Sequence, residues 1–92
     1  MRESAVENYV VRRAEAAGWE ARKVSWIGRR GAPDRVFLGH ARCVFIEFKA
    51  PGKEIIPGSQ QDREFRRLQA AYPEVYTTDS AEEALRILGI KR

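Results

Sequence analysis

The 92-residue sequence is poor in the residue types that build disulfides, soft-metal centres and membrane spans. It has a single cysteine, Cys43, which excludes an internal disulfide and a cysteine-based zinc site, and a single histidine, His40, which argues against a site with several histidine ligands. No apolar run approaches the roughly 20 residues that cross a bilayer. The first ten residues lack the apolar core of a signal peptide, so we expect a cytoplasmic protein with no membrane partner.

Composition and charge favour one folded domain, spanning residues 1–92. Hydrophobic residues make up 43% of the chain and charged residues 33%, which is ordinary for a globular protein and leaves room for one modest core. The net charge is +4, and the whole excess lies in residues 1–50. Such asymmetry indicates an anionic partner, of which nucleic acid is the commonest.

Hydrophobic periodicity predicts a mixed β-sheet flanked by helices, an α/β fold with the order α-β-β-β-α-β-α. The helices are expected at residues 4–17, 60–72 and 80–88, and the strands at residues 19–27, 34–39, 42–49 and 74–78. A tight turn at residues 39–41 should join the second and third strands into a hairpin. In the second helix, an apolar stripe of Phe65, Leu68 and Tyr72 should face the core.

The third strand contains charges where a buried strand should have none. Glu47 and Lys49 interrupt the hydrophobic stretch VFIEFKAPG, and they point to the same side because side chains two apart share a face of a strand. Charged groups are rarely buried unless they are paired or bind a metal. Hairpin pairing would also bring Asp34, at the start of the second strand, close to both residues. Two carboxylates at one sheet edge repel each other unless a proton or a divalent cation lies between them.

Two carboxylates beside a lysine suit the hydrolysis of a phosphodiester bond. The carboxylates can hold Mg²⁺ while leaving positions for water and a phosphate oxygen, and the metal lowers the pKa of its water. The lysine can orient the attacking water or stabilise the transition state. The sequence therefore predicts Asp34 and Glu47 as metal ligands and Lys49 as a catalytic group.

The spacing of these residues resembles that of a known nuclease superfamily. Pro33-Asp34, followed thirteen residues later by Glu47-Phe48-Lys49, is similar to the PD-(D/E)xK signature. The wider context GRRGAPDRVFL…VFIEFKAPG resembles the VRR-NUC family within that superfamily, and the resemblance spans nearly the whole chain. It implies a restriction-endonuclease-like core and Mg²⁺ as cofactor, with Mn²⁺ able to substitute and no small-molecule cofactor.

Glu7 and Gln61 gain a role from the resemblance and from their helical positions. Glu7 lies in the inward-facing sector of the first helix, although Ser4 and Glu7 also fit a capping box in which Glu7 would only bond the first amide. Gln61 is in phase with the apolar stripe of the second helix, although it could instead cap that helix or satisfy a backbone group. The resemblance implies that Glu7 holds a coordinated water or a second metal, that Gln61 supports the site, and that the Phe48 carbonyl ligates the metal.

Basic residues near the predicted site are candidates for contacts with DNA phosphates. Arg29 and Arg30 precede Asp34, and Lys53 follows Lys49. Each alone could be a solvated surface charge, but as a set they can neutralise backbone phosphates. The remaining arginines of this region are expected on the outer face of the second helix: Arg63, Arg66 and Arg67.

The resulting prediction is a Mg²⁺-dependent, structure-selective DNA endonuclease. Stand-alone VRR-NUC domains of phage or bacterial type resemble homodimeric Holliday-junction resolvases, which implies a homodimer that cuts four-way junctions in DNA recombination and repair, in a bacterial or phage-infected cell. A symmetric junction must be cut on two strands, which suits two symmetric sites. The dimer contacts would come from exposed apolar surface, with Trp19, Trp26, Leu85 and Leu88 as candidates. The alternatives are an endonuclease acting on flaps, nicks or plain duplex DNA, and a nucleic-acid-binding module that does not cleave.

Overall fold

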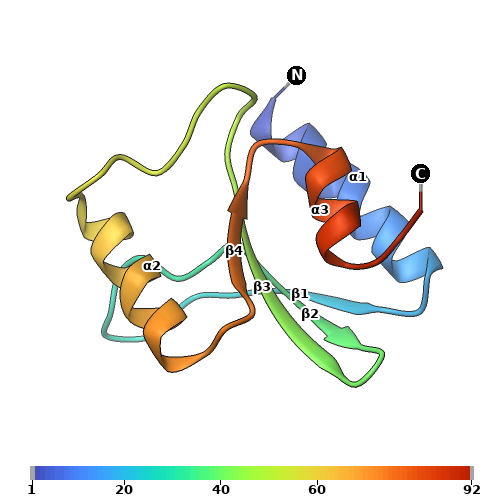
Figure 1. The fold of residues 1–92 in the computed structure, drawn as a ribbon, viewed down its shortest axis with the longest axis horizontal. Coiled ribbons are helices and arrows are strands. Elements are labelled where there is room, and N and C mark those ends of the chain that lie inside the picture. The colour runs from blue at the N-terminus through green and yellow to red at the C-terminus, as the bar shows by residue number, and fades with distance from the viewer. Residues whose placement is uncertain (1, 92) are drawn as a thin grey trace.

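The computed structural model describes residues 2–91 and has the order of elements predicted from the sequence (Figure 1). The elements are α1 (Glu3–Ala16), β1 (Glu20–Lys23), β2 (Arg35–Gly39), β3 (Arg42–Phe48), α2 (Gln60–Ala71), β4 (Val75–Thr78) and α3 (Ala81–Ile87). Helices α1 and α3 lie together against one face of the four-stranded sheet, and α2 lies on the other side (Figure 1). Across residues 2–91, no helix has both the length and the apolar character needed to cross a membrane.

The sheet has the strand order β1-β2-β3-β4. The β1–β2 and β2–β3 pairs are antiparallel, whereas β3 and β4 are parallel, so α2 belongs to the crossover between them. The β2–β3 hairpin turns at His40 and Ala41, whose φ angles of 51° and 60° are those of a tight hairpin turn. In this register Arg35 pairs with Ile46, which places Asp34, one residue before β2, beside Glu47.

The main core lies between the sheet and the layer formed by α1 and α3. Alternate residues of β3 point into it, and Val44, Ile46 and Phe48 are fully buried. Helix α1 presents a stripe with the four-residue spacing of one helical face. The other buried members of this core are Val6, Val10, Ala14, Trp19, Ala21, Phe37, Ala84, Leu85 and Leu88. Glu47 lies between Ile46 and Phe48, which are both held in this core. The core therefore also fixes the position of Glu47, which points to the opposite face of the sheet.

The opposite face of the sheet is only partly covered by α2. Phe45 and Tyr72 meet edge to face with ring centroids 6.3 Å apart, and the Tyr72 hydroxyl donates to the Cys43 carbonyl at 2.6 Å. The predicted apolar stripe of α2 lies toward the sheet but is not buried, because α2 contacts the sheet mainly at β4. The buried side chain of α2 is instead a carboxylate, Glu64, which is 5% exposed. The sequence correctly predicted that the stripe of Phe65, Leu68 and Tyr72 lies toward the sheet, and it overestimated how far these side chains are buried.

Two local predictions are wrong at the N-terminal end of the chain. The first strand ends at Lys23 instead of reaching residue 27, because Lys23 pairs with Arg35, the first residue of its partner strand β2. Within residues 2–91, one more backbone hydrogen bond continues this pairing, from Val24 N–H to the Asp34 carbonyl. Helix α1 begins one residue earlier than expected, with Arg2 at its N-cap position and no side-chain cap. The Ser4–Glu7 capping box therefore does not form, and the side chain of Glu7 is available for another contact.

The predicted dimer contacts are also wrong for three of the four residues. Trp19, Leu85 and Leu88 are 2%, 2% and 4% exposed, because they pack in the core of the chain itself. They cannot contribute an interface without unfolding. The large apolar side chains that are exposed over residues 2–91 are Tyr9, Ile27, Leu38, Ile56 and Tyr72.

Candidate active site

The hairpin delivers two carboxylates to one edge of the sheet. Asp34 lies just before β2, and its Oδ2 accepts a hydrogen bond from the backbone N–H of Phe48 at 2.8 Å. This bond ties the start of β2 to the end of β3, where Glu47 projects from the face opposite the main core. The predicted proximity of Asp34 and Glu47 is confirmed by this geometry.

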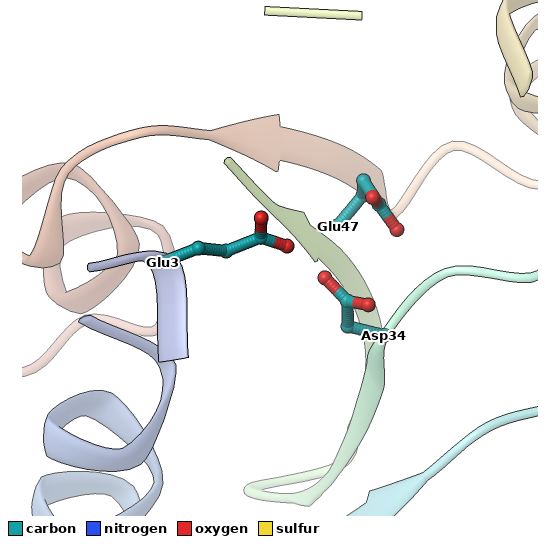
Figure 2. A group of neighbouring side chains, drawn as sticks. All are labelled: Glu3, Asp34 and Glu47. Atoms are coloured by element: carbon teal, nitrogen blue, oxygen red, sulfur yellow. The ribbon is translucent and has the colours of Figure 1, made fainter. Parts of the chain in front are cut away.

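A third carboxylate, Glu3, completes an acidic cluster that sequence reasoning missed. Glu3 extends from the first turn of α1 toward Asp34 and Glu47 (Figure 2), and one oxygen from each of the three lies within 4.8 Å of the others. Oxygen ligands at this spacing are those that Mg²⁺ and Ca²⁺ prefer. A signal for Glu3 was present in the sequence, because Glu3 and Glu7 are four residues apart and share one face of the helix.

Burial and mutual repulsion make the cluster favourable for a cation. Burial of Glu47, followed by the charge of Asp34, raises the pKa of its carboxyl from 4.5 to about 7. Burial raises the pKa of Asp34 as well, with added repulsion from Glu7 and Glu3, against the opposing hydrogen bond from Phe48. Both carboxylates thus hold their protons more tightly than in water, and a divalent cation would relieve the same repulsion that the protons relieve.

Lys49 and Gln61 form a hydrogen-bonded chain with Glu47. The Lys49 ammonium donates to Gln61 Oε1 at 2.6 Å, and Gln61 Nε2 donates to Glu47 Oε2 at 2.7 Å. Lys49 Nζ also lies 3.4 Å from Glu47 Oε2. Gln61 reaches the site from the first turn of α2, a turn fixed by Ser59, whose hydroxyl accepts from the N–H of Asp62 at 3.1 Å. The structure therefore brings the predicted Gln61 into contact with both sequence motif residues.

Glu7 lies beside the acidic cluster and is paired with a different residue. Its Oε2 accepts from Arg35 Nε at 2.6 Å, and both side chains are largely buried. Glu7 contributes negative charge near Asp34, while Glu3 is the helix α1 residue that meets Asp34 and Glu47 directly. The predicted role of Glu7 as holder of a coordinated water or second metal stays a prediction, as does the Phe48 carbonyl as a ligand.

The predicted DNA-binding residues lie on two sides of this centre. Lys53 lines a hollow that also contains Glu3, Lys49 and Gln61, so it borders the acidic cluster. Arg29 and Arg30 line a separate hollow against the α2 residues Gln60, Arg63, Glu64 and Arg67. Arg29 is not a free surface charge, because its Nε donates to Glu64 Oε1 at 3.0 Å.

Comparison with known proteins relates this fold and sequence to nucleases. A search of protein-family models gives no match. The chain is similar to a protein of Acyrthosiphon pisum secondary endosymbiont phage 1 that carries the description "Putative nuclease p44", with 39% identity over 83 residues, 89% of this chain and 87% of that protein. A solved structure described as "VRR_NUC domain" superposes with a TM-score of 0.80 and 30% sequence identity, covering 95% of this chain and 94% of that one. The mixed four-stranded sheet with its three helices is thus a restriction-endonuclease-like α/β fold.

Proposed function

The chain belongs to the VRR-NUC family, and from its acidic site we propose that it is a metal-dependent nuclease that hydrolyses phosphodiester bonds in DNA. The observation that carries this proposal is the convergence of Glu3, Asp34 and Glu47 on one point, with Lys49 alongside. Three carboxylates so close together, with one of them 5% exposed, are unfavourable unless a cation or protons separate them.

The residues present fit Mg²⁺, with Mn²⁺ as a substitute. Asp34 and Glu47 would hold the ion with the Phe48 carbonyl, and Glu3 is placed to add a third carboxylate. When bound, the metal supplies positive charge that polarises the scissile phosphate. Glu7 would act from beside this centre, where its bond to Arg35 fixes its position. All of these groups are hard oxygen donors, and the cluster that residues 2–91 form contains no cysteine or histidine that would favour a softer metal.

In this proposal Lys49 acts on the reacting atoms. An ammonium has three N–H donors. One is used by Gln61 and a second lies toward Glu47, so one remains for an attacking water or a non-bridging phosphate oxygen. Negative charge develops on those oxygens in the transition state, where a fixed donor is most effective. Gln61 keeps both the ammonium and the Glu47 carboxylate in position by bonding to each.

For the substrate, we propose a four-way DNA junction cut by a homodimer. The support is the resemblance of stand-alone VRR-NUC domains to homodimeric junction resolvases, together with one acidic centre among the described residues of each chain and the need for two symmetric cuts. The dimer would draw on exposed apolar side chains such as Leu38 and Tyr72, because Trp19, Leu85 and Leu88 are used within the chain. The basic residues Arg29, Arg30 and Lys53 would contact phosphates around the site.

The test is a cleavage assay on four-way junctions, flaps, nicked DNA and plain duplex, with and without Mg²⁺. We expect cleavage only with Mg²⁺ or Mn²⁺, fastest on junctions, with symmetric products, and no cleavage by Asp34→Asn. A matched control is Asp79→Asn, a carboxylate outside the acidic cluster that bonds the Gly52 N–H. Wild-type cleavage by Asp34→Asn would overturn the nuclease assignment, and equal rates on plain duplex would replace the junction substrate with a general one.

A further inference from the structure

A basic hollow lies beside the first turns of α2, next to the face that carries Gln61. It has a volume of about 500 Å³ and is formed between the loop at residues 28–30 and one face of α2. Its charged lining residues are Arg29, Arg30, Arg63, Arg67 and Glu64. Four arginines and one glutamate line it, so the hollow carries a clear excess of positive charge. The sequence predicts Arg63, Arg66 and Arg67 on the outer face of α2; all three are exposed, and Arg63 and Arg67 line the hollow.

Buried Glu64 makes this hollow a built feature of the fold. Glu64 is 5% exposed, accepts from Arg29 Nε at 3.0 Å and lies 3.9 Å from Arg67 Nη1. The loop also packs directly on Glu64, because a Cβ at Gly31 would lie 2.9 Å from Glu64 Cβ. The carboxylate therefore holds one arginine from the loop and one from the helix around the same space. Side chains oriented in this way lose less freedom when they bind a ligand.

The arginines in the hollow are still available to a ligand. The side chains of Arg29 and Arg67 are 50% and 67% exposed, although both lie near Glu64. Arg30 is exposed and has no ion pair or hydrogen bond to another residue in the described range 2–91. Arg63 uses one nitrogen to donate to the Gly58 carbonyl at 2.7 Å, which leaves its other donors free. Planar guanidinium groups match the paired oxygens of phosphate.

The hollow and the acidic cluster share the first turn of α2. Gln60 lines the hollow, while the next residue, Gln61, bonds to Lys49 and Glu47. The loop that carries Arg29 and Arg30 continues directly to Asp34. A DNA strand has one phosphate for each ~3.4 Å along the duplex axis, which is shorter than the ~5.4 Å pitch of a helix turn. When one phosphate of a strand is bound at the acidic cluster, the neighbouring phosphates therefore lie close enough to reach the hollow beside this turn.

We propose that the hollow lined by Arg29, Arg30, Arg63 and Arg67 binds backbone phosphates of the DNA that flank the phosphate being cut, with Glu64 as the residue that positions Arg29 and Arg67. This proposal rests on the proposed function, because it takes DNA as the ligand. None of the described residues that line the hollow is aromatic, so no base could stack on an aromatic ring there, and the hollow would contact the backbone and not the base edges. It would hold DNA in register while Lys49 and the carboxylates act on one bond.

The experiment measures DNA affinity as a function of salt, separately from cleavage. A fluorescent four-way junction is titrated by anisotropy in EDTA with wild type, Arg30→Gln, Arg67→Gln and the control Arg66→Gln. Arg66 lies on the same helix and carries the same charge, but it pairs with Asp62 and does not line the hollow. Each lost phosphate contact should lower the slope of log K against log salt by about 0.9, which is about 8-fold in affinity at 0.1 M salt. We expect this loss for Arg30→Gln and Arg67→Gln, and less than 2-fold for Arg66→Gln.

Several outcomes would overturn the proposal. Equal losses in all three variants would show that only net charge matters, and wild-type binding by both hollow variants would show that the hollow makes no contact. Competition by polyglutamate as effective as by DNA of equal charge would assign the hollow to acidic polypeptides instead. If Arg67→Gln fails to fold, Arg30→Gln decides alone, since Arg30 has no partner to lose in the described range 2–91. The proposed nuclease function fails by a different result, the absence of Mg²⁺-dependent cleavage in protein that binds DNA as expected here.

Discussion

Replacing Glu47 with glutamine should stabilise the metal-free protein at pH 8 while it destroys the proposed site. Glu47 is 5% exposed, and burial together with the charge of Asp34 raises the pKa of its carboxyl from 4.5 to about 7. When folding raises the pKa of a carboxyl, its contribution to the free energy of unfolding is fully present below the pKa of the unfolded state, here near 4.5. That contribution is lost as the pH rises through the pKa of the folded state, here near 7. The pKa of Asp34 is raised too, so it acts in the same direction.

The expected size follows from the pKa. A shift from 4.5 to about 7, at about 1.4 kcal/mol per unit, corresponds to a loss of about 3 kcal/mol between pH 5 and pH 8 in the wild type. Glutamine has the same shape, carries no charge and can still accept the hydrogen bond from Gln61 Nε2. For a domain of this size, 1 kcal/mol changes Tm by about 4–8 °C, so Glu47→Gln should melt at least ~12 °C above wild type at pH 8.

The assay is thermal unfolding followed by circular dichroism in EDTA at pH 5, 6, 7 and 8. Glu15→Gln, an exposed carboxylate on α1, is the control and should follow wild type at every pH. Glu74 does not interfere, because its bond to Arg42 lowers the pKa to about 2 and its contribution changes only below about pH 4.5. Added Mg²⁺ should raise the Tm of wild type at pH 8 and leave Glu47→Gln nearly unchanged. A wild-type Tm that is flat from pH 5 to 8, or a variant no more stable than wild type at pH 8, would refute the reasoning.

Three further predictions address the other parts of the site. Lys49→Ala should lower the single-turnover cleavage rate by about 10²–10³-fold, the loss expected for one preorganised donor, with little change in DNA affinity; a collapse of affinity with an intact rate would make Lys49 a binding residue. Glu3→Gln should weaken Mg²⁺ binding, measured by calorimetry, relative to Glu15→Gln, and equal binding by both variants would remove Glu3 from the metal site. Sedimentation at micromolar concentration should show a dimer, alone or on junction DNA; a monomer in both conditions, with plain duplex cut as fast as junctions, would favour a general nuclease.

The parts of the site that follow a strict period could be predicted from the sequence. Strand alternation and a tight hairpin turn bring Asp34 beside Glu47, because the register is fixed once the turn residues are known. The two-residue spacing in the third strand likewise puts Glu47 and Lys49 on one face, and their atoms lie 3.4 Å apart. Such contacts depend on local geometry and a short connection, which a pattern of residues describes well.

Contacts between distant elements could not be predicted in this way. Glu3 and Glu7 share a face of α1, and only the packing angle of that helix on the sheet decides that Glu3 meets Asp34 while Glu7 meets Arg35. Glu64 was missed because a carboxylate on a charged helix is normally solvated, and here the loop at Gly31 closes over it. The chain after Lys23 leads into this loop, where β2 offers no further strand partner. The first strand was therefore predicted too long, because the residue pattern does not show where the partner strand ends.

Because α2 is only weakly attached to the sheet, the part of the site that it carries can open while the rest of the chain stays folded. Helix α2 buries little apolar surface against the sheet, and the side-chain contacts that tie its N-terminal half to the strands and to the loop before Asp34 include the polar ones of Gln61 and Glu64. Segments with few buried apolar contacts open locally at a free energy well below that of global unfolding. Amide hydrogens of residues 60–71 should therefore exchange with solvent faster than those of β3, in a protein whose sheet remains intact. Each such opening moves Gln61 away from Lys49 and separates the loop from the helix. The residue that positions the lysine and the residues that line the basic hollow are therefore displaced in the same local unfolding event.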